Sequence, residues 1–473
     1  MNLLSRELEL VARASPIEIQ GRVATVRGMT IFATDLPVPI GSLVHIHGLD
    51  DLQIAGEVVG FDDGRTIVML LAATTGIVPG SLISMQQVHQ VAPVGAHMLG
   101  RVLDGMGRPI DGLGPIPETV QRPINPDPIG AMNRRRIQDP LRTGVRVLDL
   151  MTPIGRGQRL GIFAGPGVGK STLLGQIARG TDADVNVIAL IGERGREVRD
   201  FIDHALGAEG LKRSVVIVAT GDESPLLRIR AAKLACTASE FFRDQGQDVL
   251  LMMDSVTRFA HAQRQVGLSV GEPPTTKGYT PSVFSSMAEL LERAGTVESA
   301  DGTGGGSITG LYTILVEGDD MSEPVSDAAR GILDGHVVLS RKIAQSGQYP
   351  AVDVLDSVSR VASDVTDSSH QASKLQISKM IAKFRDVEDL VQIGAYAQGA
   401  NPEADTAIDL YPVINELLGQ RTDEQAPFEP ARDMMVKLAI QSGDMIQQRR
   451  AFAQSQQSQG APTVGPPAGK LGS

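Results

Sequence analysis

The chain has 473 residues, 42% of them apolar and 21% charged, a composition typical of a globular protein large enough for about three domains. Its formal net charge of −11 argues against nucleic acid as the main partner, because proteins that follow a phosphate backbone are usually basic. The single cysteine, Cys236, excludes an intramolecular disulfide. It lies in a helical apolar pattern, which predicts a core position in a protein of a reducing compartment.

The N-terminal segment 1–15, MNLLSRELELVARAS, interleaves charged residues with leucines. It therefore lacks the unbroken apolar core of a secretory signal. No later stretch approaches the ~20 apolar residues that a membrane-spanning helix needs. We expect a cytoplasmic protein. Leu4, Leu8 and Val11 fall on one helical face and form a narrow apolar stripe.

Residues 16–92 predict a small β-barrel. Short alternating or β-branched stretches at 23–26, 43–46, 54–59 and 66–71 are separated by turns rich in Gly, Asp and Pro. Residues 93–368 then alternate apolar strands with helical segments, the pattern of an α/β domain with a mostly parallel sheet. The expected strands of that sheet are 160–164, 185–191, 215–219, 249–253 and 308–316.

Residues 369–451 predict a helical domain, because Ile377, Ile381 and Phe384 recur at helical spacing. The last stretch, 452–473, is rich in Gln, Ser, Pro and Gly. Such a composition buries little apolar surface, so we expect a disordered tail there.

The stretch LGIFAGPGVGKST at 160–172 predicts a phosphate-binding loop. A strand, a glycine-rich turn and a helix beginning at Lys170 would turn backbone N–H groups and the positive helix end toward phosphate oxygens. Lys170 would reach the β and γ phosphates, and Ser171 would ligate Mg²⁺. The expected nucleotide-binding residues are Gly165, Pro166, Gly167, Val168, Gly169, Lys170, Ser171 and Thr172. Ala164 stands where the consensus has its first glycine, which we expect to alter only the entry to the loop.

Two carboxylates follow other strands of the same sheet. Asp254 comes directly after 249–253, and Glu193 follows 185–191, so both are expected at the edge where the phosphates would lie. We expect Asp254 to hold Mg²⁺ with Ser171, and Glu193 to polarise the attacking water. Spacing alone supports equally well a Glu193 that merely stabilises a helix N-terminus.

Several longer stretches resemble the catalytic subunits of the rotary-ATPase superfamily. They are GERGREVRDF, MDSVTRFAHAQRQVGLSVGEPPTTKGYTPSVF, LLERAG, GDDMSEPVSDAARGILDGHVVLSR and YPAVDVLDSVSR, and they are most similar to flagellar protein-export ATPases of type III secretion systems. The resemblance runs almost unbroken from about Leu99 to Arg360. It implies a central P-loop domain of the RecA-like kind and a homo-hexamer in which each nucleotide lies between two subunits.

The resemblance also implies roles for individual residues. Glu193 matches the catalytic glutamate and Arg194 its neighbouring phosphate-site arginine. Arg360 matches the arginine finger that enters the next subunit's site, and Tyr349 matches the aromatic residue that stacks on adenine. The alternatives are a surface ion pair for Arg360 and a packed aromatic side chain for Tyr349. The expected catalytic residues are Lys170, Glu193, Arg194, Asp254 and Arg360.

The implied function is an ATP-hydrolysing motor that uses ATP/ADP and Mg²⁺ and energises flagellar protein export. Implied partners are a stator-like regulatory protein at the N-terminal segment, a central coiled-coil stalk, export substrates with their chaperones, and a membrane export gate. The loop 271–281 would touch the stalk or a substrate. A frayed end and an ordinary surface loop are the alternatives for these two segments. The protein would act at the cytoplasmic face of the inner membrane. The alternatives are an injectisome ATPase, a rotary ATP synthase catalytic subunit, a non-catalytic nucleotide-binding ring subunit, which the Glu193 carboxylate speaks against, and an RNA translocase, which the acidic balance disfavours.

Overall fold

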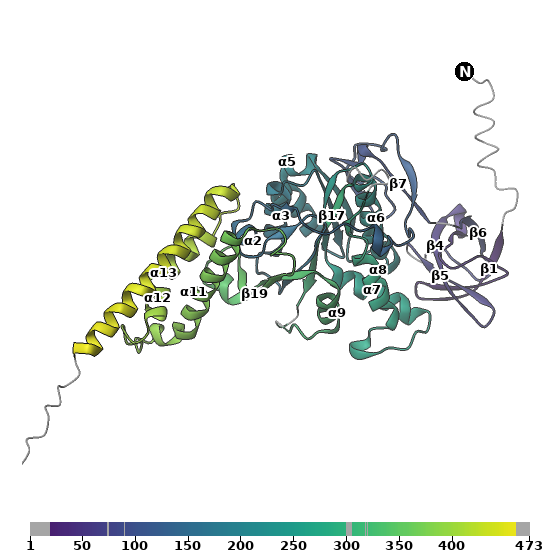
Figure 1. Cartoon of the computed structure of the whole chain (residues 1–473). Coiled ribbons are helices and arrows are strands. Elements are labelled where there is room, and N and C mark those ends of the chain that lie inside the picture. Colours follow the sequence, from purple (N-terminus) through teal and green to yellow (C-terminus); the bar gives the residue numbers. More distant parts are fainter. Residues whose placement is uncertain are drawn as a thin grey trace, which may run out of the picture.

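The computed structural model describes residues 19–459, except 73, 74, 89, 299–304, 317 and 319. A β-barrel, an α/β domain and a helical domain follow one another along the chain and lie in a row (Figure 1). This confirms the expected fold class. The segment 1–15, for which partner docking was expected, lies outside the described residues.

The N-terminal domain is a closed barrel with the strand order β1-β2-β5-β4-β3-β6. Its strands are β1 (Gln20–Arg27), β2 (Thr30–Thr34), β3 (Leu43–His47), β4 (Gln53–Asp62), β5 (Arg65–Leu70) and β6 (Leu82–Gln87). Alternate residues along β4 are buried, as a strand with one face inward requires. Closure pairs both edges of the sheet and encloses a small core that includes Ile31, Ile46 and Leu70.

The central domain is built on a nine-stranded sheet with the order β19-β18-β12-β17-β15-β13-β14-β8, and β16 pairs with β17. All pairs are parallel except β18 with β19 and β16 with β17. The sheet strands are β8 (Val102–Asp104), β12 (Arg159–Ala164), β13 (Val185–Ile191), β14 (Ser214–Ala219), β15 (Asp248–Asp254), β16 (Gly295–Thr296), β17 (Ser307–Leu315), β18 (Gly335–Leu339) and β19 (Val352–Ser359). Two small pairs lie beside it, β7 (Val91–Val94) with β9 (Val120–Pro123) and β10 (Pro140–Leu141) with β11 (Ile154–Gly155).

Helices cover the sheet, which explains why its strands are continuous apolar runs. They are α2 (Arg146–Met151), α3 (Lys170–Gly180), α4 (Gly195–Asp200), α5 (Gly207–Lys212), α6 (Pro225–Arg243), α7 (Val256–Ser269), α8 (Pro281–Leu291), α9 (Pro324–Ile332) and α10 (Arg341–Gln345). A π-helical turn, η4 (Phe201–Leu206), joins α4 to α5, and short 3-10 turns are η1 (Leu49–Asp51), η2 (Ala96–Met98), η3 (Ala131–Asn133) and η5 (Thr276–Gly278).

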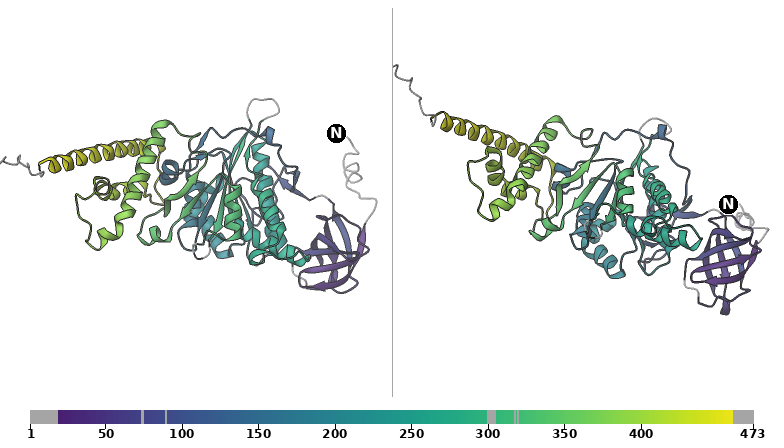
Figure 2. Two further views of the ribbon diagram at one scale, coloured as in Figure 1. Left: turned by 60° about the horizontal axis from the view of Figure 1, so that its bottom comes forward. Right: turned by 90° about the horizontal axis from the view of Figure 1, so that it is seen from below.

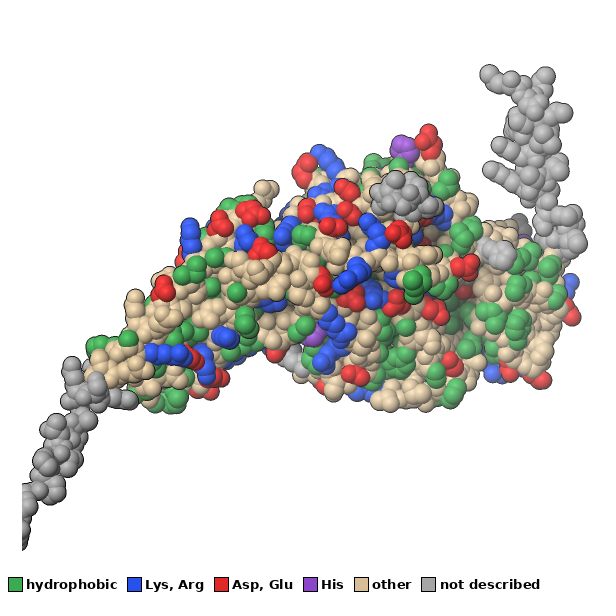
Figure 3. Space-filling model, viewed as in Figure 1, with side chains coloured by type: hydrophobic (Ala, Val, Ile, Leu, Met, Phe, Trp, Pro, Cys, Tyr) green, Lys and Arg blue, Asp and Glu red, His purple; other side chains and the backbone are tan. Residues whose placement is uncertain are grey.

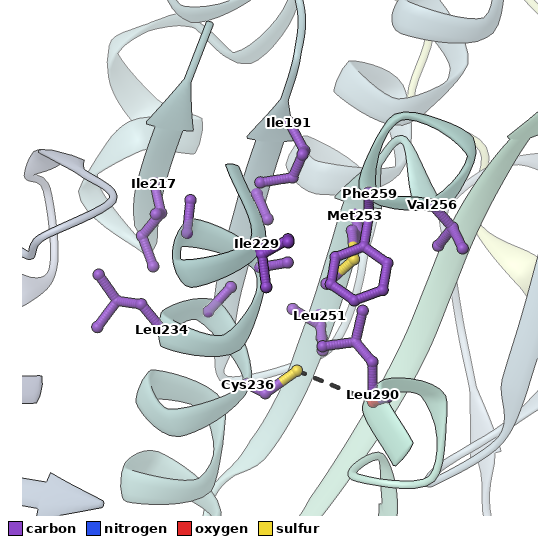
Figure 4. Packing of buried hydrophobic residues seen from close by; sticks show 14 of the residues in the cluster. Ile191, Ile217, Ile229, Leu234, Cys236, Leu251, Met253, Val256, Phe259 and Leu290 are labelled. Atoms are coloured by element: carbon purple, nitrogen blue, oxygen red, sulfur yellow. Dashed lines mark hydrogen bonds between the residues drawn. The ribbon is translucent and has the colours of Figure 1, made fainter. Parts of the chain in front are cut away.

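Helix α6 shows how one covering helix is fixed. Ser224 caps its N-terminus by accepting a hydrogen bond from the Leu227 N–H, and Pro225 occupies the first turn, where no N–H is needed. Its inner face packs on β13, β14 and β15 (Figure 4). Cys236 lies fully buried on this face, and burial raises the pKa of its thiol to about 11. The predicted core position of Cys236 is confirmed.

The C-terminal domain consists of α11 (Ser368–Gln392), α12 (Pro402–Leu418) and α13 (Phe428–Gln459). The prediction of disorder is wrong for residues 452–459, which continue α13 away from the body (Figure 2). Helix-favouring Ala and Gln recur up to Gln459, and neither Gly nor Pro occurs from Phe452 to Gln459. Arg449 and Arg450 also tie the preceding turn to acidic residues of α12.

No helix in the described part of the chain is both long and apolar enough to span a bilayer. On the face seen in Figure 3, basic and acidic side chains are interspersed over the central and helical domains. That face therefore presents mixed charge rather than a continuous basic track.

Candidate active site

The phosphate-binding loop lies at the carboxyl end of β12, which pairs with β17 on one side and β18 on the other. Gly167 and Gly169 have φ values of 78° and 92°, a left-handed conformation that glycine adopts without strain. Gly169 caps α3 at its N-terminus. A Cβ placed on Gly167 would meet no heavy atom within 4 Å, so the space in front of the loop is open to a ligand.

Three predicted residues converge beside this loop. The Lys170 ammonium contacts the Asp254 carboxylate and lies 3.7 Å from Glu193 Oε1. Asp254 is the last residue of β15, and its Oδ1 accepts a hydrogen bond of 2.7 Å from the Thr313 hydroxyl of β17. Because β12, β13 and β15 are parallel, their carboxyl ends bring these side chains to one edge, as predicted.

Glu193 occupies an unusual electrostatic environment. Burial is the main cause that raises the pKa of Glu193, and the nearby Asp254 charge acts in the same direction. The charges of Lys170 and Arg258 lower it, and the net pKa is about 7. Its Oε1 is buried and accepts no hydrogen bond from the described residues. A carboxylate that ionises near neutral pH and has a free acceptor is suited to general-base catalysis.

The other P-loop residues surround the same opening. Gly165 and Val168 are buried, and the Val168 side chain anchors the loop in the core. Pro166 is exposed. Ser171 and Thr172 are exposed on the first turn of α3, so their hydroxyls are accessible to a ligand. Ala164 is buried and pairs with Leu315 and Leu339, which makes it part of the sheet.

Arg194 does not join this cluster. Its side chain is 79% exposed and forms an ion pair of 2.9 Å with Glu197. Tyr349 does lie at the loop: its ring carbons come within 3.5–3.6 Å of a Cβ built on Gly169. The ring borders a cavity of about 320 Å³ that the P-loop, α3 and the loop 419–424 enclose.

Arg360 lies at the opposite edge of the sheet from the P-loop. Its N–H donates to the carbonyl of Asp334, whose carboxylate pairs with Arg159, the first residue of β12. The P-loop follows the last residue of β12, about 17 Å further on at ~3.3 Å per residue. The exposed guanidinium lies 3.4 Å from the carbonyl of Arg330. Arg360 therefore cannot reach the P-loop of its own chain.

Two residues near Glu193 were not singled out from the sequence. Arg258 of α7 lies 3.4 Å from Glu193 Oε2 and also donates to the Gly192 carbonyl. A hydrogen bond with Glu193 lowers the pKa of Glu197. Arg258 lies in the first turn of α7 and Glu197 in the first turn of α4, and each helix follows a strand that ends at the site. This position just after a strand end is the sequence feature that could have identified them.

The loop 271–281 is exposed over most of its length, but its aromatic residue is not. Tyr279 is buried, and its hydroxyl lies 3.0 Å from His261 Nε2. The Lys277 side chain is half exposed and lies 3.8 Å from Asp320. Contact of this loop with a stalk stays a prediction that would involve Lys277 rather than Tyr279.

These features define a P-loop nucleotide-binding domain with an acidic residue at each of two neighbouring strand ends. Residues 144–359 match the family model described as ATP synthase alpha/beta family, nucleotide-binding domain. Residues 366–437 match the T3SS EscN ATPase C-terminal domain.

Relatives extend this match over most of the chain. The flagellum-specific ATP synthase of Pseudomonas aeruginosa is 44% identical over 428 residues, which cover 90% of this chain and 94% of that protein. The flagellum-specific ATP synthase of Salmonella typhimurium is 47% identical and covers 86% of this chain and 91% of its own length. The type 3 secretion system ATPase of Xanthomonas euvesicatoria is 46% identical, with 88% and 93% covered.

Solved structures agree with the sequence relatives. The assembled ATPase EscN of the enteropathogenic E. coli type III secretion system has a TM-score of 0.82 and 40% identity, and the match covers 89% of this chain and 100% of that one. EscN in complex with its central stalk EscO has a TM-score of 0.81. The chain belongs to the type III secretion and flagellum-specific ATPases, an ATP-hydrolysing enzyme family. The predicted family and enzyme class are thereby confirmed.

Proposed function

We propose that this chain hydrolyses MgATP at the P-loop of a hexameric ring and thereby powers protein export by a flagellar type III apparatus. The observation that carries the proposal is the convergence of Lys170, Glu193 and Asp254 at the carboxyl edge of one sheet. A ring subunit that only bound nucleotide would have no use for a buried carboxylate whose pKa lies near 7.

Each residue has a distinct chemical task. The backbone N–H groups of Gly165, Gly167, Val168 and Gly169, together with the N-terminus of α3, would bind the phosphates, and Lys170 would balance their charge. Pro166 has no N–H and contributes only the shape of the turn. Glu193 would accept a hydrogen bond from a water through its free Oε1 and take up the proton as the water oxygen attacks the γ phosphorus. The bond between the γ phosphorus and the β–γ bridging oxygen breaks in the same step, so that ADP leaves with that oxygen and phosphate is formed. Ser171 and Asp254 suit Mg²⁺, which would neutralise charge on the phosphates when bound. Tyr349 would stack on adenine, and Arg194 would turn from Glu197 toward the phosphates.

Assembly completes the site. Arg360 lies too far from its own P-loop to act there, yet it is exposed and its guanidinium has no acidic partner among the described residues. Such a group is available to a neighbouring subunit, where it would stabilise charge on the transferred phosphoryl group. EscN has been solved assembled and with a central stalk, which supports a ring and a stalk partner for this chain.

We further propose a stator-like partner at the N-terminal segment, contact with substrates, chaperones and the export gate, and a position at the cytoplasmic face of the inner membrane.

The carboxylate is tested with Glu193→Gln. This variant is expected to bind a fluorescent ATP analogue as the wild type does, because the change keeps shape and removes only the base. Hydrolysis should fall by roughly 10²–10⁴-fold. Unchanged turnover would contradict the assigned role of Glu193.

The trans arginine is tested by mixing variants. Arg360→Ala rings should assemble and lose roughly 10³-fold in turnover. Mixing them with Lys170→Ala subunits should restore some activity, because some interfaces then combine an intact P-loop with an intact finger. Mixed rings without any rescue would contradict the trans site.

Loss of motility in a cell that carries Glu193→Gln would support the flagellar machine, whereas normal filaments would favour another secretion system.

A further inference from the structure

The cavity beside Tyr349 contains a buried amide that the chemistry at the phosphates does not use. Gln176 lies on α3, two turns beyond Lys170, and its side chain is only 6% exposed. It lines the cavity of about 320 Å³ together with Gly167, Gly169 and Tyr349. A base attached to phosphates in the P-loop would therefore lie within reach of Gln176.

The orientation of the Gln176 amide is fixed by one contact. Its Nε2 donates a hydrogen bond of 3.0 Å to the carbonyl oxygen of Arg421. The opposite orientation would place two acceptor oxygens against each other, so the amide nitrogen must face Arg421. The side-chain Oε1 accepts no hydrogen bond from any described residue, which leaves one acceptor available at the cavity.

The other amide at this cavity is fully occupied and makes the wall rigid. Gln420 Oε1 accepts from the Arg146 N–H at 2.8 Å, and its Nε2 donates to the carbonyls of Gly144 and Glu424 at 2.9 and 3.0 Å. Its own N–H donates to the Tyr349 carbonyl at 2.9 Å. Gln420 thus holds the loop that orients Gln176 through its side chain and holds Tyr349 through its backbone N–H.

We infer that Gln176 selects adenine, its Oε1 accepting a hydrogen bond from the 6-amino group while Tyr349 stacks on the ring. This inference rests on the proposed nucleotide site. Adenine carries a donor at position 6, whereas guanine carries an acceptor there. A buried acceptor that meets another acceptor is left unpaired, which is the situation that makes polar sites selective.

The test compares three substrates with the full-length ring: ATP, GTP, and purine riboside triphosphate, which is ATP without the 6-amino group. For the wild type, kcat/KM should favour ATP over each of the other two by roughly tenfold, mainly through KM, as expected from one hydrogen bond. Gln176→Met keeps the length and burial of the side chain but removes the acceptor. In this variant the preference should fall to about twofold or less.

Arg179→Gln is the matched control. Arg179 donates from the same helix to the Thr422 carbonyl of the same loop at 2.8 Å, but it is exposed and does not line this cavity. If Gln176 only tethers the loop, both variants will weaken all three substrates alike and keep the tenfold preference. That result, or a wild type that uses purine riboside triphosphate as well as ATP, would overturn the inference while hydrolysis itself stands. A wild type that hydrolyses none of the three would instead refute the proposed function, and the inference with it.

Discussion

The acid limb of the ATPase pH profile should report the ionisation of Glu193. Burial and the Asp254 charge raise the pKa of Glu193 to about 7, and a general base acts only when it is ionised. As pH falls below that value, kcat/KM should therefore fall about tenfold per pH unit. Above that value it should level off. The ratio kcat/KM is the informative quantity because it reports groups of the free enzyme.

Arg258→Met is the perturbation that should move this limb. The Arg258 charge lowers the pKa of Glu193, and its Nη2 lies 3.4 Å from Glu193 Oε2. Two unit charges at that distance interact by about 5 kcal/mol at an effective dielectric constant of ~20. Because the Arg258 side chain is 31% exposed, solvent screens much of this energy. We expect a rise of about one pKa unit, which corresponds to about 1.4 kcal/mol.

The assay measures kcat/KM for ATP from pH 5.5 to 9 at constant ionic strength. At pH 7 the ionised fraction of Glu193 should fall from about one half to about one tenth in Arg258→Met, so activity should drop about fivefold, and at pH 9 the two proteins should nearly agree. Arg228→Met is the control, since Arg228 pairs with Gln265 and its charge is not among the causes that shift Glu193. A loss of the same size at every pH would refute the electrostatic argument and assign Arg258 a purely geometric role.

Three further predictions concern stability. Gly175→Ala would place a Cβ 2.6 Å from the Ala205 carbonyl oxygen. The unfolding free energy should therefore fall by about 2 kcal/mol and the melting temperature by ~4–8 °C. An unchanged melting temperature would show that η4 shifts freely to make room. Arg293→Met would leave the buried Glu240 without its 2.7 Å partner and should cost about 3–5 kcal/mol in urea unfolding, whereas a cost below ~1 kcal/mol would show that Glu240 finds another partner. Burial raises the pKa of Asp149 to about 6, so the folded state binds this proton more tightly than the unfolded state, and the carboxyl's contribution to stability falls by about 3 kcal/mol as pH rises from about 4 to 6. Asp149→Asn should remove that pH dependence, and parallel curves of unfolding free energy for the two proteins would contradict it.

The sheet and the phosphate edge could be predicted because their signals are local. Buried parallel strands are continuous apolar runs, and the expected strand 185–191 agrees residue for residue with β13. The polar residues that follow such strands are brought together by the topology of the sheet, whatever the details of packing. The positions of Glu193 and Asp254 beside Lys170 could for this reason be predicted from the sequence.

The cavity beside Tyr349 could not be predicted, because its walls come from distant parts of the chain. Gln176 meets Arg421 across 245 positions, and Gln420 meets Arg146 across 274. The loop 419–424 has no period and no motif that would mark such contacts. The side-chain direction of Arg194 could not be predicted either, because it is set by an ion pair with Glu197 on the following helix.

The interior strand β12 would link the two halves of the proposed catalytic apparatus, the P-loop and the arginine finger. The last residue of β12 leads into the P-loop, which would receive the arginine finger of one neighbouring subunit. The first residue of β12, Arg159, forms an ion pair with Asp334. The carbonyl of Asp334 in turn accepts a hydrogen bond from the backbone N–H of Arg360. A displacement of β12 that accompanied nucleotide binding would thus shift the finger that the same subunit offers to its other neighbour. Since a finger supplied in trans is worth roughly 10³–10⁵ in rate, even a small displacement would change the neighbour's turnover strongly. All six residues of β12 pair with β17, and residues 161–164 also pair with β18, so the strand would transmit such a movement without needing a flexible hinge.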